Sequence, residues 1–256
     1  MRRFSAIMVL TALLGHSPLP AGAAVGCTLS NPSEDLKYLY PAMTSYKEEL
    51  RELNRMPNGR ETYDWLKTRL GSDLDPVYET FETPYTLYTV FEKDKVIGIV
   101  HGVNVPGEGG VIQIFISADP QTGAVARVFF QRLESLASKW LRKKEFLSQF
   151  TGLTLADFYK HDYFAAADPA SVADKVGRIA NPLPDEKGLA DYLASVRGIR
   201  KNLILMDAFA YRRQNEPFYV RAQQELAAFK AGKTEQTKQA DSLAPTPQTS
   251  SGKEVQ

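Results

Sequence analysis

Four short strand patterns in a row, separated by tight turns, constrain this chain more than any other feature. The stretches are rich in β-branched and aromatic residues, which favour extended structure. They are Tyr85–Phe91, Val96–Val105, Val111–Ser117 and Ala124–Gln131. The connections are too short for crossover helices, so each strand must turn back beside the one before it. The sequence therefore predicts an antiparallel β-meander of about four strands.

Helical patterns flank the meander on both sides. Before it, we expect Ser33–Leu53 to be helical with a break at Pro41, and Glu61–Leu70 to be a helix that ends at Gly71. After it come the amphipathic or apolar stretches Leu133–Phe150, Leu155–Phe164, Gly188–Ala210 and Glu216–Ala231. A block of strands between helices predicts an α+β fold rather than a doubly wound sheet. We expect one domain over residues 30–230.

The N-terminus is typical of a secretory signal peptide. Arg2 and Arg3 supply the positive charge, and the apolar run Ala6–Leu14 is too short to span a membrane as a helix. Small residues follow at positions 21–24, as a cleavage site requires. We therefore predict a signal peptide over Met1–Ala24 and an exported protein, either periplasmic or anchored on the outer side of the inner membrane. The alternative interpretation is a mobile apolar tail of a cytosolic protein.

The chain contains one cysteine, Cys27. A single cysteine excludes an internal disulfide, a CxxC redox pair and a thiolate metal cage. The preceding residues, Ala24-Val25-Gly26, resemble a bacterial lipoprotein box, in which the cysteine carries lipid after cleavage, although Ala24 stands where leucine is usual. Cys27 is therefore a candidate lipid anchor.

Charge and composition exclude further classes. The 31 basic and 30 acidic residues give a formal net charge of +1, whereas nucleic-acid binders usually carry a strong basic excess. Three histidines are too few for a His-rich metal site. The segment 233–256 has no aromatic residue and is rich in Gln, Ser, Thr and Lys, so we expect it to be disordered.

Catalytic motifs are not visible in the chain. There is no GxSxG and no HExxH pattern. His101 lies in a strand pattern, which favours a hydrogen-bonded structural histidine, and His161 is expected at the surface. The basic run Lys139–Lys144 is interpreted as a solvated helix face, with docking to an acidic partner or anionic lipid as the alternative. The glycines of Pro106–Gly110 either allow a tight turn or let a ligand approach the main chain.

The order of motifs over Pro84–Asp157 resembles one known family. It runs through Ile97-Gly98, a glycine-rich loop at 107–110, the hairpin Asp119–Gly123, a valine-rich strand and Gln149-Phe150-Thr151-Gly152. This order is similar to that of the FMN-binding domain found in the flavin-carrying subunits of the sodium-pumping NADH:quinone reductase and of its Rnf relative. The resemblance implies the family's fold and a flavin cofactor.

Two positions depart from the family pattern. The family's Glu-Thr-Pro-Gly stands here as Glu134-Ser135-Leu136-Ala137. The family's Ser-Gly-Ala-Thr, whose threonine oxygen is esterified by the FMN phosphate, aligns with Glu186–Leu189, and leucine has no oxygen to form that ester. Thr122-Gly123-Ala124 falls in a hairpin turn instead. FMN is therefore expected to be noncovalent.

The resemblance also implies where a noncovalent flavin would lie. The cofactor-binding residues it indicates are Gly107, Gly109, Gly110, Glu134 and Ser135. Phe130 or Phe150 would flank the ring, and backbone N–H groups near Gly188 would receive the phosphate. Asp185 and Glu186 would oppose a phosphate there by their charge.

Two main hypotheses for function follow. The first is an exported flavoprotein that transfers electrons with a membrane redox complex, in which FMN carries the chemistry. The second is a flavin-less periplasmic binding or assembly module that kept the fold and docks on other proteins. A hydrolase or lyase with an unrecognised site is a third alternative.

Overall fold

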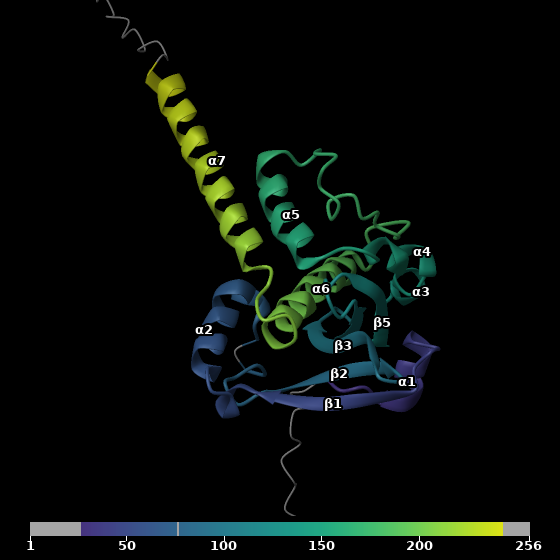
Figure 1. Ribbon diagram of the computed structural model, residues 1–256. Helices are drawn as coiled ribbons and strands as arrows, with labels where there is room; N and C mark the ends of the chain where they lie inside the picture. Colours follow the sequence, from purple (N-terminus) through teal and green to yellow (C-terminus); the bar gives the residue numbers. More distant parts are fainter. Residues whose placement is uncertain (1–26, 76, 243–256) are drawn as a thin grey trace, which may run out of the picture.

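The centre of the computed structural model is a five-stranded antiparallel sheet in the order β1-β2-β3-β4-β5 (Figure 1). The structure describes residues 27–75 and 77–242, so the expected signal peptide lies outside the described residues. The strands are β1 (Ser45–Glu52), β2 (Pro84–Glu92), β3 (Lys95–Pro106), β4 (Val111–Ala118) and β5 (Val125–Leu133). The predicted α+β class and the antiparallel meander are confirmed, and the sheet has one strand more than expected.

The additional strand replaces part of a predicted helix. Helix α1 covers only Pro32–Leu39, and β1 then pairs antiparallel with β2 over its whole length. Pro41 lacks the N–H that a continuing helix needs. The prediction of helix through Leu53 was wrong because Lys, Glu, Leu and Arg are good helix formers, whereas pairing with β2 decides the conformation of β1.

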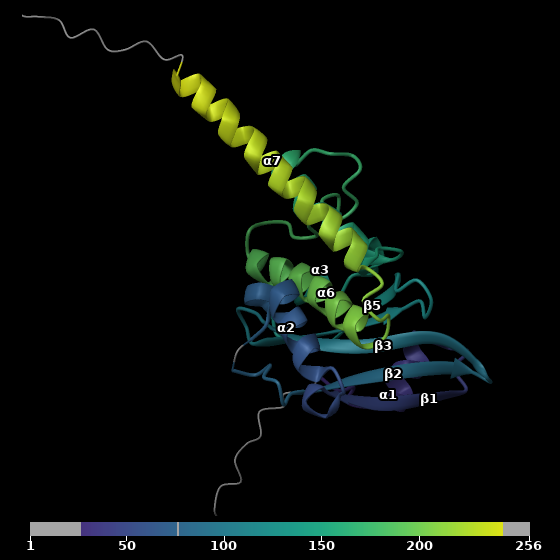
Figure 2. The same cartoon turned by 60° about the vertical axis from the view of Figure 1, so that its left-hand side comes forward.

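Two different layers cover the faces of the sheet. Helix α6 (Leu189–Phe209) crosses one face, and α2 (Gly59–Leu70) packs beside it (Figure 2). Helix α2 ends at Gly71, as predicted, with a positive φ of 55°. The segment from Cys27 through α1 covers the opposite face, where it forms a separate core with Tyr88 and Phe115. The central strands are thus covered on both sides, whereas β1 has no buried residue.

The predicted helix Leu133–Phe150 is wrong. Strand β5 continues to Leu133, and the rest forms α3 (Ser138–Leu141), α4 (Lys144–Leu147) and a 3₁₀ turn over Ser148–Phe150. Lys143 between the two helices is extended, with ψ 138°. This break lets side chains from three successive turns all enter the core, namely Leu141, Phe146 and Phe150.

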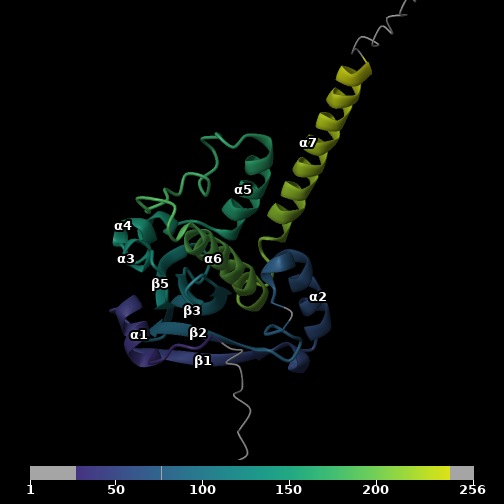
Figure 3. The ribbon, with the colours of Figure 1, turned by 180° about the vertical axis from the view of Figure 1, so that it is seen from behind.

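Helices α5 (Leu155–Ala167) and α7 (Glu216–Ser242) pack against each other, and α7 then extends away from the body (Figure 3). Helix α7 enters the segment 233–256 that was expected to be disordered, and residues 243–256 lie outside the described residues. Within the described part of the chain, none of the helices has both the length and the apolar character needed to span a membrane.

Candidate functional site

Strands β2 and β3 separate before either one ends. Their pairing stops at Leu87 and His101. Beyond that point Pro84–Thr86 stays paired with β1, and Gly102–Pro106 stays paired with β4. Within the described residues, the β2-facing edge of Gly102–Pro106 therefore has no strand beside it. An unpaired edge presents backbone donors and acceptors to whatever occupies the gap.

A cavity of about 320 Å³ lies at this gap. Its size falls in the range of small-molecule sites, about 300–1,000 Å³. The lining comes from both faces of the sheet, because successive residues of β3 point to opposite sides. The lining residues are Cys27, Asp75, Tyr78, Glu79, Tyr85, Gly102, Val103, Asn104, Val105, Pro106, Val111, Gln113, Arg132 and Leu205.

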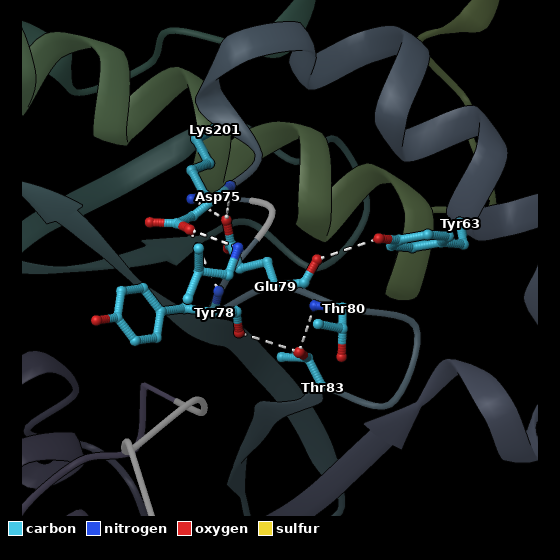
Figure 4. Close-up of polar contacts among 8 residues, drawn as sticks. Tyr63, Asp75, Tyr78, Glu79, Thr80, Thr83 and Lys201 are labelled. Atoms are coloured by element: carbon cyan, nitrogen blue, oxygen red, sulfur yellow. Dashed lines mark hydrogen bonds and ion pairs between the residues drawn. The ribbon is translucent and has the colours of Figure 1, made fainter.

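The loop between α2 and β2 forms one wall of the cavity. Figure 4 shows the polar contacts of this loop. The Asp75 carboxylate accepts hydrogen bonds from the Val77 and Tyr78 backbone N–H groups, at 2.9 and 3.2 Å. The Thr83 hydroxyl accepts from the Thr80 N–H at 2.8 Å and donates to the Tyr78 carbonyl at 3.1 Å. These local bonds give the loop a defined shape.

A buried ion pair attaches this loop to α6. Lys201 Nζ donates to Glu79 Oε2 at 2.5 Å, and the Asp75 N–H donates to the same oxygen at 2.9 Å. Only 2% of Lys201 is exposed. Because a buried charge is costly unless it is paired, each member requires the other. The pair positions this wall of the cavity.

Two buried polar atoms of the lining have no hydrogen-bond partner among the described residues: Tyr85 Oη and Asn104 Oδ1. Burial, reinforced by the Glu79 carboxylate, raises the pKa of Tyr85, so its hydroxyl stays protonated and can donate. The Tyr85 ring is held against Phe209, with centroids 5.0 Å apart. Unsatisfied buried polar groups are uncommon and costly, and both of these belong to residues that line the cavity.

A structural histidine lies behind the cavity. His101 Nδ1 and Asn202 Oδ1 are 2.8 Å apart, and Asn202 Nδ2 donates to the carbonyls of His101 and Ile114 at 2.9 and 3.1 Å. Burial lowers the pKa of His101 to about 4. The expected hydrogen-bonded structural role of His101 is confirmed, and Asn202 is the partner that sequence reasoning missed.

The five residues predicted to bind a cofactor meet at the start of α6, and none of them lines the cavity. They surround Asp191, which is 1% exposed. Its carboxylate accepts from the Glu108 N–H at 2.8 Å and from the Ser135 hydroxyl. Asp191 was not among the residues predicted from the sequence, although an acid in the first helical turn is a known signal.

The glycines of this loop make room for the protein's own chain. A Cβ on Gly109 would lie 2.1 Å from the Glu134 carbonyl oxygen, and one on Gly107 would lie 2.7 Å from Asp191 Oδ1. Glu134 itself pairs with Arg132 at 2.7 Å. These close approaches explain the glycines without a ligand.

The residues at the start of α6 do not fit a flavin. The Asp191 carboxylate lies in the first turn of α6, at the helix end that would receive the phosphate, and it would repel a second anion. Phe130 and Phe150, expected beside the ring, are buried in the core at 2% and 0% exposure. A ring could reach them only by opening the core. Flavin binding stays a prediction that this geometry does not support.

Cys27, the candidate lipid anchor, is buried. Its side chain packs with Leu29, Leu36 and other members of the core between α1 and the sheet. Burial raises the pKa of the Cys27 thiol to about 12. A lipid chain on this sulfur would have to enter the cavity, which Cys27 also lines, or displace the residue from its core.

The other polar features are structural or solvent-facing. His161 Nδ1 lies 2.6 Å from Asp174 Oδ2, and its side chain is 33% exposed. In the run Lys139–Lys144, Arg142 donates to the Phe130 carbonyl at 2.6 Å. Arg142 and Lys144 border a second cavity of about 490 Å³ together with Arg127.

Residues 27–75 and 77–242 contain no group of three side chains suited to hold a metal ion.

A scan against protein-family models finds no family that matches this chain, and a search of curated proteins finds no significant match.

Proposed function

We propose that the protein is an exported, flavin-less binding module whose ligand occupies the cavity beside the open edge of β3. The observation that carries this proposal is the pair of unpartnered polar atoms, Tyr85 Oη and Asn104 Oδ1, in the wall of a cavity of about 320 Å³. Among the described lining residues, no hydrogen bond joins a nucleophile to an activating base, so binding is the function that the lining supports.

A fragment titration of the full chain tests the proposal. Neutral amides and alcohols, with N-methylacetamide as the first probe, are added while ¹H–¹⁵N spectra are recorded. We expect shifts at Tyr85 and over Gly102–Val105. Fragments that leave these resonances unchanged, even near their solubility limit, would overturn the proposal.

A matched pair of variants gives the control. Tyr85→Phe removes one hydroxyl from the cavity and keeps the ring, so we expect weaker fragment binding. Tyr159→Phe removes another buried, unpartnered hydroxyl that lies outside the cavity lining, so binding should be unchanged. Equal effects of the two substitutions would show that the cavity is not the site.

The same preparation tests the flavin hypothesis, with its membrane redox complex as partner. Its support is the motif order over Pro84–Asp157. An absorbance spectrum with a flavin band, before or after addition of excess FMN, would favour electron transfer. A featureless spectrum would agree with the binding module proposed here.

A further inference from the structure

The open edge of β3 offers a main chain as well as a cavity wall. Gly102–Pro106 pairs with β4 on one side, and within the described residues no strand lies on the other. Backbone groups at such an edge hydrogen-bond readily to an added chain. An added strand would continue the ladder that ends at Leu87 and His101.

The two faces of this edge differ in chemistry. On the face toward α6, the cavity is lined by Val103, Val105 and Leu205. On the other face it is lined by the amides of Asn104 and Gln113, which are cross-strand neighbours. A strand laid along the edge points its side chains alternately to these two faces. The apolar face therefore selects apolar side chains, and the amide face selects side chains that hydrogen-bond.

Charge adds a second restriction. Among the charged lining residues, Glu79 pairs with Lys201 and Arg132 with Glu134, and the Asp75 carboxylate accepts two backbone N–H hydrogen bonds from its own loop. An anionic ligand would have to break one of the ion pairs, and a cationic ligand would have to compete with these backbone N–H groups for Asp75 in a partly buried site. The occupant should therefore be neutral.

We infer that the ligand is a neutral, extended peptide that adds a strand to β3, with apolar side chains toward α6 alternating with hydroxyl or amide side chains toward Asn104. At about 3.3 Å per residue, the open edge accommodates about five residues. This inference rests on the proposed function and specifies the ligand of the same cavity.

The test uses a blocked pentapeptide, acetyl-Thr-Val-Thr-Val-Thr-amide, titrated into the full chain. We expect shifts over Gly102–Val105 and slower hydrogen exchange of the amides that face the gap. N-methylation of alternate peptide amides, placed to meet β3, should weaken binding by at least about tenfold. The analogue with lysine in place of valine should bind weakly, because its ammonium groups would face the apolar side.

Two exposed valines provide matched protein variants. Val111→Lys places a charge at the cavity rim, where Val111 is 42% exposed, and should weaken peptide binding. Val172→Lys, at a valine that is 82% exposed and outside the lining, should leave binding unchanged. Both substitutions are at exposed positions, so neither is expected to unfold the protein.

The outcomes of these titrations distinguish failure of the peptide inference from failure of the proposed function. If amide fragments shift the cavity resonances and the peptide does not, the peptide inference fails and the proposed function stands. If neither probe shifts them, both fail. Binding that is equally strong for the N-methylated peptide, or that leaves hydrogen exchange unchanged, would also overturn strand addition.

Discussion

Lys201 Nζ lies 2.5 Å from Glu79 Oε2, and their side chains are only 3% and 12% exposed. The pair joins the middle of α6 to the loop that forms a wall of the cavity. Its removal should therefore affect stability and the shape of the cavity together.

Lys201→Met should lower the free energy of unfolding by about 3–5 kcal/mol, because it leaves the Glu79 carboxylate buried without a partner. The double variant Lys201→Met with Glu79→Gln should recover much of this loss. Urea unfolding of the three proteins measures the difference. The control is Lys67→Met, whose partner Asp64 is half exposed and whose loss should cost at most about 1 kcal/mol. Equal losses for the two lysines would contradict the assigned role of the buried pair.

Stability should decrease in mild acid because of His101. Burial lowers its pKa to about 4 from an ordinary value of 6.5, and the charge of Lys201 acts in the same direction. Between these values the unfolded chain binds a proton that the folded chain does not. The contribution of neutral His101 to the free energy of unfolding is complete above about pH 6.5. It is lost as the pH falls below that value, by about 1.4 kcal/mol per pH unit.

Urea unfolding at several values between pH 5 and 7 tests this dependence. His101→Gln cannot titrate, so its stability should vary less with pH than that of the unchanged protein. Identical pH slopes for the two proteins would show that His101 is not responsible.

The Cys27 thiol should resist modification in the folded protein. Its burial and raised pKa leave little thiolate at pH 8. Reaction with a thiol reagent should be slow until urea unfolds the chain, and the chain has no second cysteine to obscure the signal. As a control, the double variant Cys27→Ala with Thr28→Cys places the thiol on the exposed neighbouring residue and should react at once. Fast labelling of folded Cys27 would reopen its role as a lipid anchor.

Gly109→Ala should destabilise the protein by about 1–3 kcal/mol, because its methyl group would meet the Glu134 backbone, which is held by the end of β5. Gly232→Ala is the matched control. No atom lies within 4 Å of its Cβ, and alanine favours helix, so this change in α7 should be neutral or stabilising by up to about 1 kcal/mol. Denaturant midpoints of both variants test the comparison. If Gly109→Ala leaves the free energy of unfolding unchanged, the explanation that this glycine makes room for the Glu134 backbone is wrong.

The meander could be predicted because its strands are formed by local patterns of β-branched and aromatic residues. Strand β1 could not be, since its charged residues suit a helix and only its pairing with β2 makes it extended. The break at Lys143 was missed for a related reason. It depends on bringing Leu141, Phe146 and Phe150 to the core, which is a requirement of packing and not of local preference.

The cavity could not be predicted from the sequence, for a different reason. It depends on where the pairing of β2 and β3 stops, and both strands keep a strand-like pattern beyond that point. Tyr85 and Asn104 look like ordinary strand residues in the sequence. The glycine loop was found because glycines are visible locally, although their contacts with Glu134 and Asp191 were not.

The charged residues of β1 affect the association of one copy of the protein with another. It forms one border of the sheet, and its sequence from Lys47 to Glu52 contains five charged residues among six, KEELRE. Stacking a second molecule along that border would desolvate these charged groups, and charged side chains on an edge strand are a known protection against aggregation. We expect the protein to stay dispersed at high concentration, and a foreign strand to be accepted in the interior of the sheet, where β3 is uncharged from Gly102 to Pro106.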